Sequence, residues 1–151
     1  MNLLAILDRE GVSYRVLHHR RTYTAQDLAA AEHVSGWNVI KPVLVKADDA
    51  FVLCALPASQ RIDLHKLADA LHARHVELAD ERTLAKVCID CELGAEPPIG
   101  SLFGVPTVME DDLQDANTVL FQAGTHEDAI EMPLGDFVRL TKPKVADFGR
   151  P

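Results

Sequence analysis

Two apolar runs on either side of a short polar turn constrain the fold of this chain more than any other stretch. The runs are residues 39–46 and 51–56, and residues 47–50 read Ala-Asp-Asp-Ala between them. Apolar runs of this length around a polar turn are typical of two paired sheet strands. The second run is apolar on both faces, so we expect it to lie in the centre of a sheet.

Lys41 is the unusual residue of the first run. Side chains alternate along a strand, so Lys41 shares a face with Val43 and Val45, whereas Lys46 points to the other face. An unpaired charge is costly to bury. Two interpretations are open from the residues alone: the ammonium group reaches water around a sheet edge, or it projects into a cleft and binds an anion.

Composition indicates an ordinary globular protein. The 151 residues are 48% hydrophobic and 25% charged, which fits one domain over residues 1–151. No apolar run approaches the ~20 residues that span a bilayer. The first ten residues lack the basic start of a signal peptide, and three cysteines form no disulfide framework, so we expect a cytoplasmic protein without a membrane partner. A net charge of −8 argues against coating DNA or RNA, but it permits a small basic site for one RNA end.

The rest of the chain alternates between helical and strand patterns, with a strand-rich last third. Helices are expected after the capping residues Asn2, Thr24, Asp63 and Asp80, and over residues 134–140. Further strands are expected at residues 13–17, 76–79, 105–109, 118–122 and 129–132. The predicted fold class is α/β (mixed α+β): a single domain with a mixed, mostly antiparallel sheet surrounded by helices.

Metal and redox chemistry are weakly indicated. Cys88 and Cys91 form a lone Cys-x-x-Cys with His72 and His75 nearby in sequence, so a zinc-dependent hydrolase using Cys88, Cys91 and His75 is a distant alternative. A second such cysteine pair is absent, and the pair follows a helix instead of beginning one, as redox pairs do. We expect two ordinary, partly buried cysteines, no metal and no cofactor.

The loop at residues 94–100, Gly-Ala-Glu-Pro-Pro-Ile-Gly, is the second candidate for chemistry. The sequence has no Gly-x-Ser-x-Gly elbow, no phosphate-binding Walker loop and no dinucleotide fingerprint. Glycines let a backbone approach a ligand closely, and prolines stiffen the chain between them. Such a loop can direct backbone N–H groups at a developing oxyanion, or it can be a rigid turn without a ligand.

Four motifs in a fixed order resemble the YbaK/ProX family, the free-standing relatives of the editing domain inserted in bacterial prolyl-tRNA synthetases. They are the strand start Val39-Ile40-Lys41, the earlier helix start Tyr23-Thr24-Ala25, the loop Gly94-x-x-x-Pro98-x-Gly100, and residues 108–113 with Asp111. The resemblance implies a hydrolase that cleaves the ester between a wrong amino acid and the 3′ end of a tRNA, without a metal or a cofactor.

The resemblance also implies roles for individual residues. Lys41 would hold the RNA end, and Gly94, Pro98 and Gly100 would line the catalytic site beside the ester. Tyr23, Thr24 and Asp111 would bind substrate, Tyr23 by stacking on a base. The basic run at residues 18–21 would meet the acceptor stem or would be a solvated turn.

The expected partners are the 3′ end of an aminoacyl-tRNA and, as a further candidate, prolyl-tRNA synthetase. The expected substrate is tRNA(Pro) carrying alanine, cysteine or a serine-like residue. The alternative is a non-catalytic module that binds tRNA ends or a synthetase. Many relatives have a small hydroxyl residue after the lysine, but this chain has Pro42. Because proline lacks a backbone donor, Pro42 should lie at a strand edge or a bulge.

Overall fold

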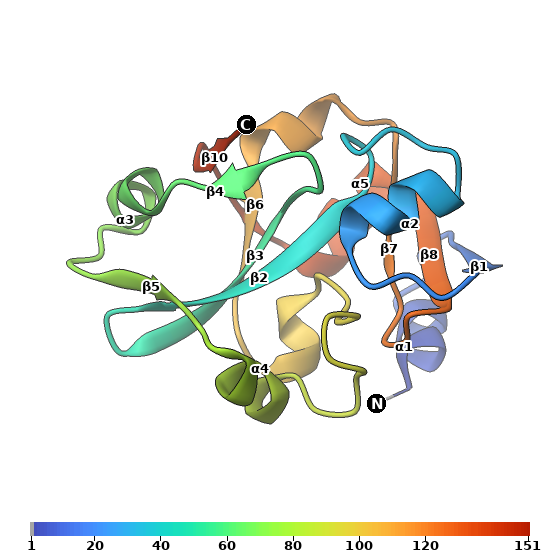
Figure 1. Ribbon diagram of the computed structural model, residues 1–151, viewed down its shortest axis with the longest axis horizontal. Helices are drawn as coiled ribbons and strands as arrows, with labels where there is room; N and C mark the ends of the chain where they lie inside the picture. The colour runs from blue at the N-terminus through green and yellow to red at the C-terminus, as the bar shows by residue number, and fades with distance from the viewer. Residues whose placement is uncertain (1) are drawn as a thin grey trace.

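The computed structural model describes residues 2–151 as a mixed α/β fold (Figure 1). Its helices are α1 (Leu3–Arg9), α2 (Ala25–Ala31), α3 (Leu64–Leu71), α4 (Glu81–Val87) and α5 (Leu134–Thr141), with the 3₁₀ turns η1 (Gly100–Phe103) and η2 (Asp111–Asp115). Its strands are β1 (Arg15–His18), β2 (Ile40–Ala47), β3 (Ala50–Pro57), β4 (Arg61–Ile62), β5 (Val76–Leu78), β6 (Thr107–Glu110), β7 (Thr118–Gln122), β8 (Asp128–Pro133), β9 (Lys144–Ala146) and β10 (Gly149–Arg150).

The two apolar runs form the antiparallel hairpin β2–β3. The pairing runs without interruption from Ile40 opposite Pro57 to Ala47 opposite Ala50. The hairpin lies inside a five-stranded sheet of order β5-β2-β3-β6-β9, in which β6 pairs with β3 and β9 in parallel. The prediction that the second run is a central strand is confirmed, because β3 has a neighbour on each side.

The sequence pattern suggested one sheet, but the strands divide into three. β1, β8 and β7 form a separate three-stranded antiparallel sheet, and β4 pairs with β10. The mixed, mostly antiparallel pairing is as predicted, but β4, β9 and β10 were missed. These strands have two or three residues, which is too short for alternation to be recognised in a sequence.

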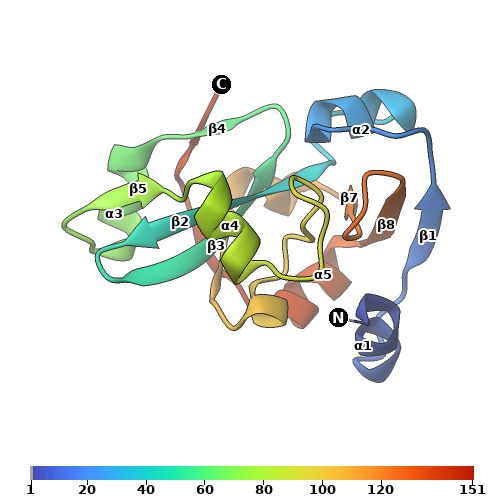
Figure 2. The ribbon, with the colours of Figure 1, turned by 60° about the horizontal axis from the view of Figure 1, so that its bottom comes forward.

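Local capping explains why the helices begin where the sequence predicts. Asn2, Thr24, Asp63 and Asp80 each accept a hydrogen bond at the side chain from a backbone N–H in the first helical turn. For α2 this fixes the residue before the cap, Tyr23, at the start of a helix that lies over β7 and the first residues of β2 (Figures 1 and 2). None of the helices in residues 2–151 has the length and apolar character to cross a bilayer.

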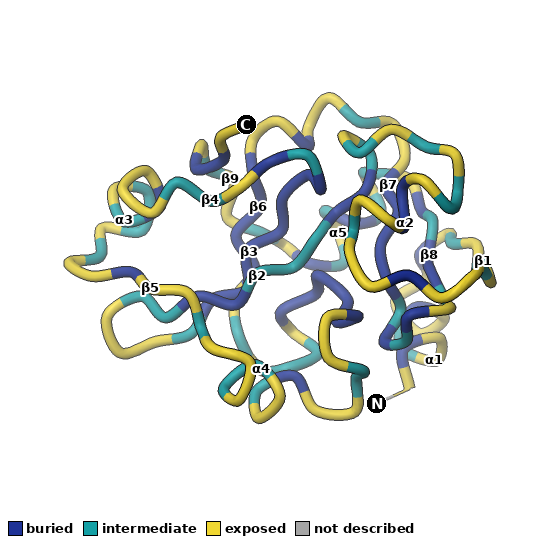
Figure 3. The backbone as a smooth tube through the Cα atoms, viewed as in Figure 1, coloured by how far each residue is buried: buried dark blue, intermediate teal, exposed yellow. Residues whose placement is uncertain are grey.

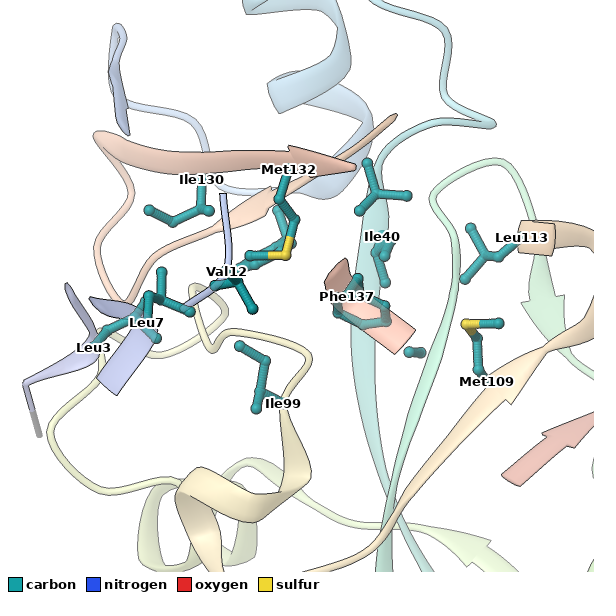
Figure 4. Packing of buried hydrophobic residues seen from close by; sticks show 13 residues of the cluster. Leu3, Leu7, Val12, Ile40, Ile99, Met109, Leu113, Ile130, Met132 and Phe137 are labelled. Carbon is teal, nitrogen blue, oxygen red and sulfur yellow. The ribbon is translucent and has the colours of Figure 1, made fainter. Parts of the chain in front are cut away.

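Buried side chains fill both faces of the five-stranded sheet, and the buried backbone concentrates along β3, β6 and β7 (Figure 3). On one face, Ile40 and Met109 pack with Ile99 and with Phe137 of α5 (Figure 4). The other face packs under α3 in a second cluster, whose fully buried members include Val45, Cys54, Leu56, Leu67 and Phe148. A third cluster joins α2 to the start of β2 and to β7.

Candidate active site

The two larger sheets meet at one point and then separate. Val39, just before β2, forms a single parallel bridge with Leu120 of β7, supported by a 3.0 Å hydrogen bond from the Leu120 N–H to the Asn38 carbonyl. Beyond this bridge, β2 continues into the five-stranded sheet and β7 stays in the three-stranded sheet. An uncovered strand edge therefore begins at Lys41.

Pro42 lies on this uncovered edge. β5 pairs with β2 only at residues 45–47, and the Leu44 carbonyl accepts from the Ala79 N–H on that same side. Pro42, two residues earlier, faces the same side but has no strand opposite it. Its missing N–H therefore breaks no ladder bond, which agrees with the expected edge position.

Lys41 is half-buried and has no partner for its charge. Its ammonium group makes no hydrogen bond or ion pair with any residue of the described chain, 2–151. Burial, followed by repulsion from Arg61, lowers the pKa of Lys41. By alternation, Lys41 stands on the same face as Val39, which packs against Leu28 of α2. Lys41 also shares this face with Val43 and Val45, which belong to the cluster under α3.

Tyr23 and Gly94 come together next to His126. The Tyr23 side chain is 62% exposed, and its ring centroid lies 5.1 Å from that of His126. A Cβ placed on Gly94 would lie 3.4 Å from His126 Cε1 and 3.7 Å from the Tyr23 carbonyl oxygen, and φ of Gly94 is +88°. A side chain at position 94 would therefore be strained and crowded.

The end of β7 supports the same corner. Gln122 follows Leu120 by two residues, so it projects to the side on which Leu120 packs against α2. Its side-chain amide donates to the carbonyls of Thr125 and Asp128, and its oxygen accepts from the Thr22 hydroxyl at 3.0 Å. This buried bridge ties the segment before Tyr23 to the turn that carries His126.

The backbone of the 94–100 loop is already hydrogen-bonded within the protein. The Gly94 N–H donates to Glu96 Oε2 at 2.9 Å, and the Gly100 N–H donates to Thr107 Oγ1 at 2.8 Å. The N–H groups of residues 95 and 99 donate to the carbonyls of residues 92 and 97. These four donors are committed inside the protein, so an oxyanion hole built from them would require their bonds to be exchanged.

Within the same loop, Gly94 is exposed, whereas Pro98 and Gly100 are buried. A Cβ on Gly100 would lie only 2.4 Å from the Val105 carbonyl oxygen, so the close approach of the two backbones requires glycine there. A direct role of Pro98 or Gly100 in catalysis stays a prediction, and their packing favours a rigid turn.

Glu96 is a buried carboxyl group under this loop, with 3% of its surface exposed. Desolvation raises its pKa, although the hydrogen bond from Gly94 and the nearby His126 act in the opposite direction. Burial also raises the pKa of Cys88 to about 12 and that of Cys91 to about 11. Both cysteines are therefore thiols at neutral pH, which are poor nucleophiles.

The zinc alternative finds no geometric support in residues 2–151, since no three side chains of suitable type gather there to hold a metal ion. Thr24 Oγ1 accepts from the Asp27 N–H at 3.0 Å and so acts as a helix cap. Asp111 is exposed in η2, where its carboxylate accepts from the Gln114 side chain. No hydrogen bond joins Thr24 or Asp111 to the corner formed by Tyr23, Gly94 and His126.

Sequence reasoning missed His126, which is 4% exposed. Its Nε2 donates to the Leu93 carbonyl at 2.7 Å, which leaves Nδ1 as an acceptor, and this buried atom has no partner among residues 2–151. The only signal in the sequence was the polar turn at residues 124–127, Gly-Thr-His-Glu, between two strands. That pattern does not reveal which residues the imidazole meets.

The sequence profile of the aminoacyl-tRNA editing domain matches residues 19–140. This chain belongs to that family, a class of hydrolases that act on the aminoacyl-tRNA ester. The multifunctional Ser/Thr-tRNA deacylase ProXp-y of Escherichia coli K12 is 24% identical over 98% of this chain and 91% of its own length. The proline–tRNA ligase of Bacillus subtilis 168 is 34% identical over 62% of this chain and 16% of its own length.

Solved structures share the fold. A hypothetical protein superposes with a TM-score of 0.90 at 19% identity, covering 99% of this chain and 100% of its own. A protein described as a candidate trans-editing enzyme for prolyl-tRNA synthetase superposes with a TM-score of 0.84 at 20% identity, covering 99% of this chain and 95% of its own. The predicted family and fold are thereby confirmed.

Proposed function

We propose that this protein is a trans-editing deacylase that hydrolyses mischarged tRNA, with tRNA(Pro) carrying a small wrong amino acid as its first substrate. The unpaired Lys41 ammonium carries this proposal. It is half-buried at the part of β2 that has no strand opposite it on the β5 side. A terminal nucleotide offers a phosphate for the lysine and a base for the exposed Tyr23 ring.

Hydrolysis of an aminoacyl ester needs little activation by the protein. An aminoacyl ester is already activated, so fixing the RNA end and orienting a water molecule can supply much of the rate enhancement. Burial and Arg61 lower the pKa of Lys41. A bound phosphate would raise this pKa again, because an anion favours the charged ammonium.

The amino acid specificity is proposed from the relatives. A deacylase named for serine and threonine is similar over nearly the whole chain, which supports small side chains with serine among them. One methylene group changes discrimination by only ~1–3 kcal/mol. We therefore expect graded preferences among alanine, cysteine and serine instead of a single accepted substrate.

Prolyl-tRNA synthetase is the proposed protein partner, because similarity to part of a proline–tRNA ligase supports shared recognition of the same tRNA. An acidic protein with a net charge of −8 gains little affinity from the tRNA backbone. A synthetase that holds the tRNA would supply that affinity. Adding the synthetase should lower KM for mischarged tRNA(Pro) without changing kcat.

The test is deacylation of Ala-, Cys- and Ser-tRNA(Pro), with correctly charged Pro-tRNA(Pro) as the control. We expect hydrolysis of at least one mischarged tRNA and protection of the correct one. No hydrolysis of any mischarged tRNA, together with binding of a non-hydrolysable aminoacyl-adenosine analogue, would favour the non-catalytic module. The non-catalytic alternative is favoured by the 94–100 loop, because its N–H groups at residues 94, 95, 99 and 100 are already hydrogen-bonded within the protein and do not form an oxyanion hole.

A further inference from the structure

Arg21 belongs to the basic run for which a tRNA contact was expected, but its partly exposed guanidinium group is paired with neighbouring side chains. Nη2 lies 3.2 Å from Glu92 Oε2 and Nη1 lies 3.3 Å from Glu127 Oε1. Nε donates to the Tyr23 hydroxyl at 3.1 Å, and the guanidinium carbon lies 5.4 Å from the centroid of the Tyr23 ring. Two carboxylates therefore neutralise a charge that a phosphate would otherwise use.

The neighbouring Arg20 provides a contrast. It is exposed, and its guanidinium group makes no hydrogen bond or ion pair with the described residues, 2–151. Two adjacent arginines thus differ completely in their surroundings. Arg20 remains available to a phosphate, whereas Arg21 joins three segments: the stretch before α2, the 92–96 loop and the β7–β8 turn.

The bonds of Arg21 converge on one aromatic ring. Glu92, which accepts from Arg21, also accepts from the His126 N–H at 2.7 Å through its other oxygen. The Tyr23 ring is therefore held by Arg21 and by His126, whose own backbone is fixed to the same carboxylate. Tyr23 nevertheless stays 62% exposed. It is a fixed and accessible aromatic surface beside Gly94.

We propose that Arg21 is a positioning residue that fixes the Tyr23 ring as a stacking platform for the terminal base of the bound RNA. The proposal rests on the deacylase function proposed above. A base stacks with less loss of side-chain freedom on a ring that is already immobile, and stacking on an aromatic side chain tolerates any base. Arginine suits the task because its planar group donates in several fixed directions, which a lysine cannot reproduce.

The experiment compares Arg21→Met, Arg21→Lys and Tyr23→Ala, with Arg20→Met as the matched control. KM and kcat are measured for the mischarged tRNA(Pro) that the wild type hydrolyses best, over a range of salt concentrations. Tyr23→Ala should raise KM by about 5- to 150-fold, and Arg21→Met by about tenfold. The value of kcat should stay within about twofold in both variants, and Arg21→Lys should not restore KM.

Salt dependence separates positioning from direct phosphate binding. Loss of a phosphate contact reduces the slope of log(kcat/KM) against log[salt] by about one unit. We expect that reduction for Arg20→Met and no change for Arg21→Met. In the double variant Arg21→Met/Tyr23→Ala, KM should equal that of Tyr23→Ala alone, since Arg21 acts through the ring. Additive effects, or a reduced slope for Arg21→Met, would overturn the proposal.

A measurement without turnover distinguishes failure of this inference from failure of the deacylase proposal. The Tyr23–His126 ring contact should give nuclear Overhauser effects in the free wild-type protein and lose them in Arg21→Met, while Arg20→Met keeps them. If they persist in Arg21→Met, Arg21 does not position the ring, whatever the activity. If they are lost but no mischarged tRNA is hydrolysed by the wild type and none binds, the platform has no RNA base to hold and both proposals fail.

Discussion

The two halves of the candidate site are built in opposite ways. Lys41 stands on β2, an eight-residue strand in unbroken register with β3, and its charge has no partner in residues 2–151. Tyr23, Gly94 and His126 lie on irregular segments, where side-chain and backbone hydrogen bonds connect one loop to the next. The regular half leaves a charge free, and the irregular half satisfies nearly every polar group.

This difference shows two ways in which a fold can fix the direction of a functional side chain. Register fixes the direction of a strand side chain to the face on which it stands, so Lys41 is aimed without any bond to its own head group. A loop has no register, and its shape must come from specific bonds. Removing the Lys41 charge should therefore weaken substrate binding without destabilising the fold. Substitutions among Tyr23, Gly94 and His126 should instead change the conformation of the loops that carry them.

The largest expected effect is that of Lys41→Met, which keeps most of the apolar stem and removes the charge. Loss of a charged hydrogen bond to substrate should lower kcat/KM by roughly 10- to 150-fold, or ~1.5–3 kcal/mol. Lys46→Met is the matched control, because Lys46 lies on the same strand with its side chain on the opposite face. Chemical unfolding should show that Lys41→Met is at least as stable as the wild type, since burial disfavours this charge. Equal activity of the two variants would remove Lys41 from the site.

The same difference explains what the sequence could predict. The hairpin, the helix caps and the strand face of Lys41 depend on neighbours within a few residues, so pattern and propensity were sufficient for them. Tyr23, Gly94 and Lys41 were named in advance because motif order pointed to them. The surroundings of Arg21 were not predictable, because its carboxylate partners lie 71 and 106 residues away along the chain. The division into separate sheets was not predictable either, because it depends on pairings between strands that lie far apart in the sequence, such as β1 with β8. The two larger sheets are joined by the bridge between Val39 and Leu120.

Gly100→Ala tests whether Gly100 of the 94–100 loop is needed only for the packing of the loop or also for catalysis. The new Cβ would lie 2.4 Å from the Val105 carbonyl oxygen and 2.7 Å from Thr107 Oγ1, so unfolding should be easier by up to about 3 kcal/mol. Gly104→Ala is the control: its φ is +72° with nothing within 4 Å of a Cβ, so only the backbone strain of about 1 kcal/mol applies. Urea unfolding measures both variants. A normally stable Gly100→Ala protein with lost deacylation would instead show that Gly100 acts on substrate.

A smaller effect concerns the titration of Lys41 itself. Burial and Arg61 lower its pKa in the free protein, and a bound phosphate should raise the pKa again by favouring the charged form. The measurement is a pH titration of the lysine side-chain carbons by NMR, with and without adenosine 5′-monophosphate as a stand-in for the RNA end. The Lys46 signals serve as the internal reference. A Lys41 titration that the nucleotide leaves unchanged would place the phosphate elsewhere.

The smallest effect is expected from Glu96→Gln, which keeps an acceptor for the Gly94 N–H but removes the buried charge. The pKa of Glu96 is raised in the folded protein, so the folded state binds this proton more tightly than the unfolded state does. Its contribution to stability is therefore full below the ordinary glutamate pKa and is lost as pH rises through the raised value. Urea unfolding should show Glu96→Gln more stable than the wild type at pH 7 by up to about 1 kcal/mol, with no gain near pH 4.

Glu96→Ala is the comparison variant, because it leaves the Gly94 N–H without its acceptor and should lose about 1 kcal/mol at every pH. Together the two variants separate the hydrogen bond from the charge. If Glu96→Gln is instead less stable than the wild type at pH 7, the carboxylate is held charged by the neighbouring His126. The loop half of the site would then contain an ion pair of its own, and the contrast with the unpaired charge of Lys41 would be sharper still.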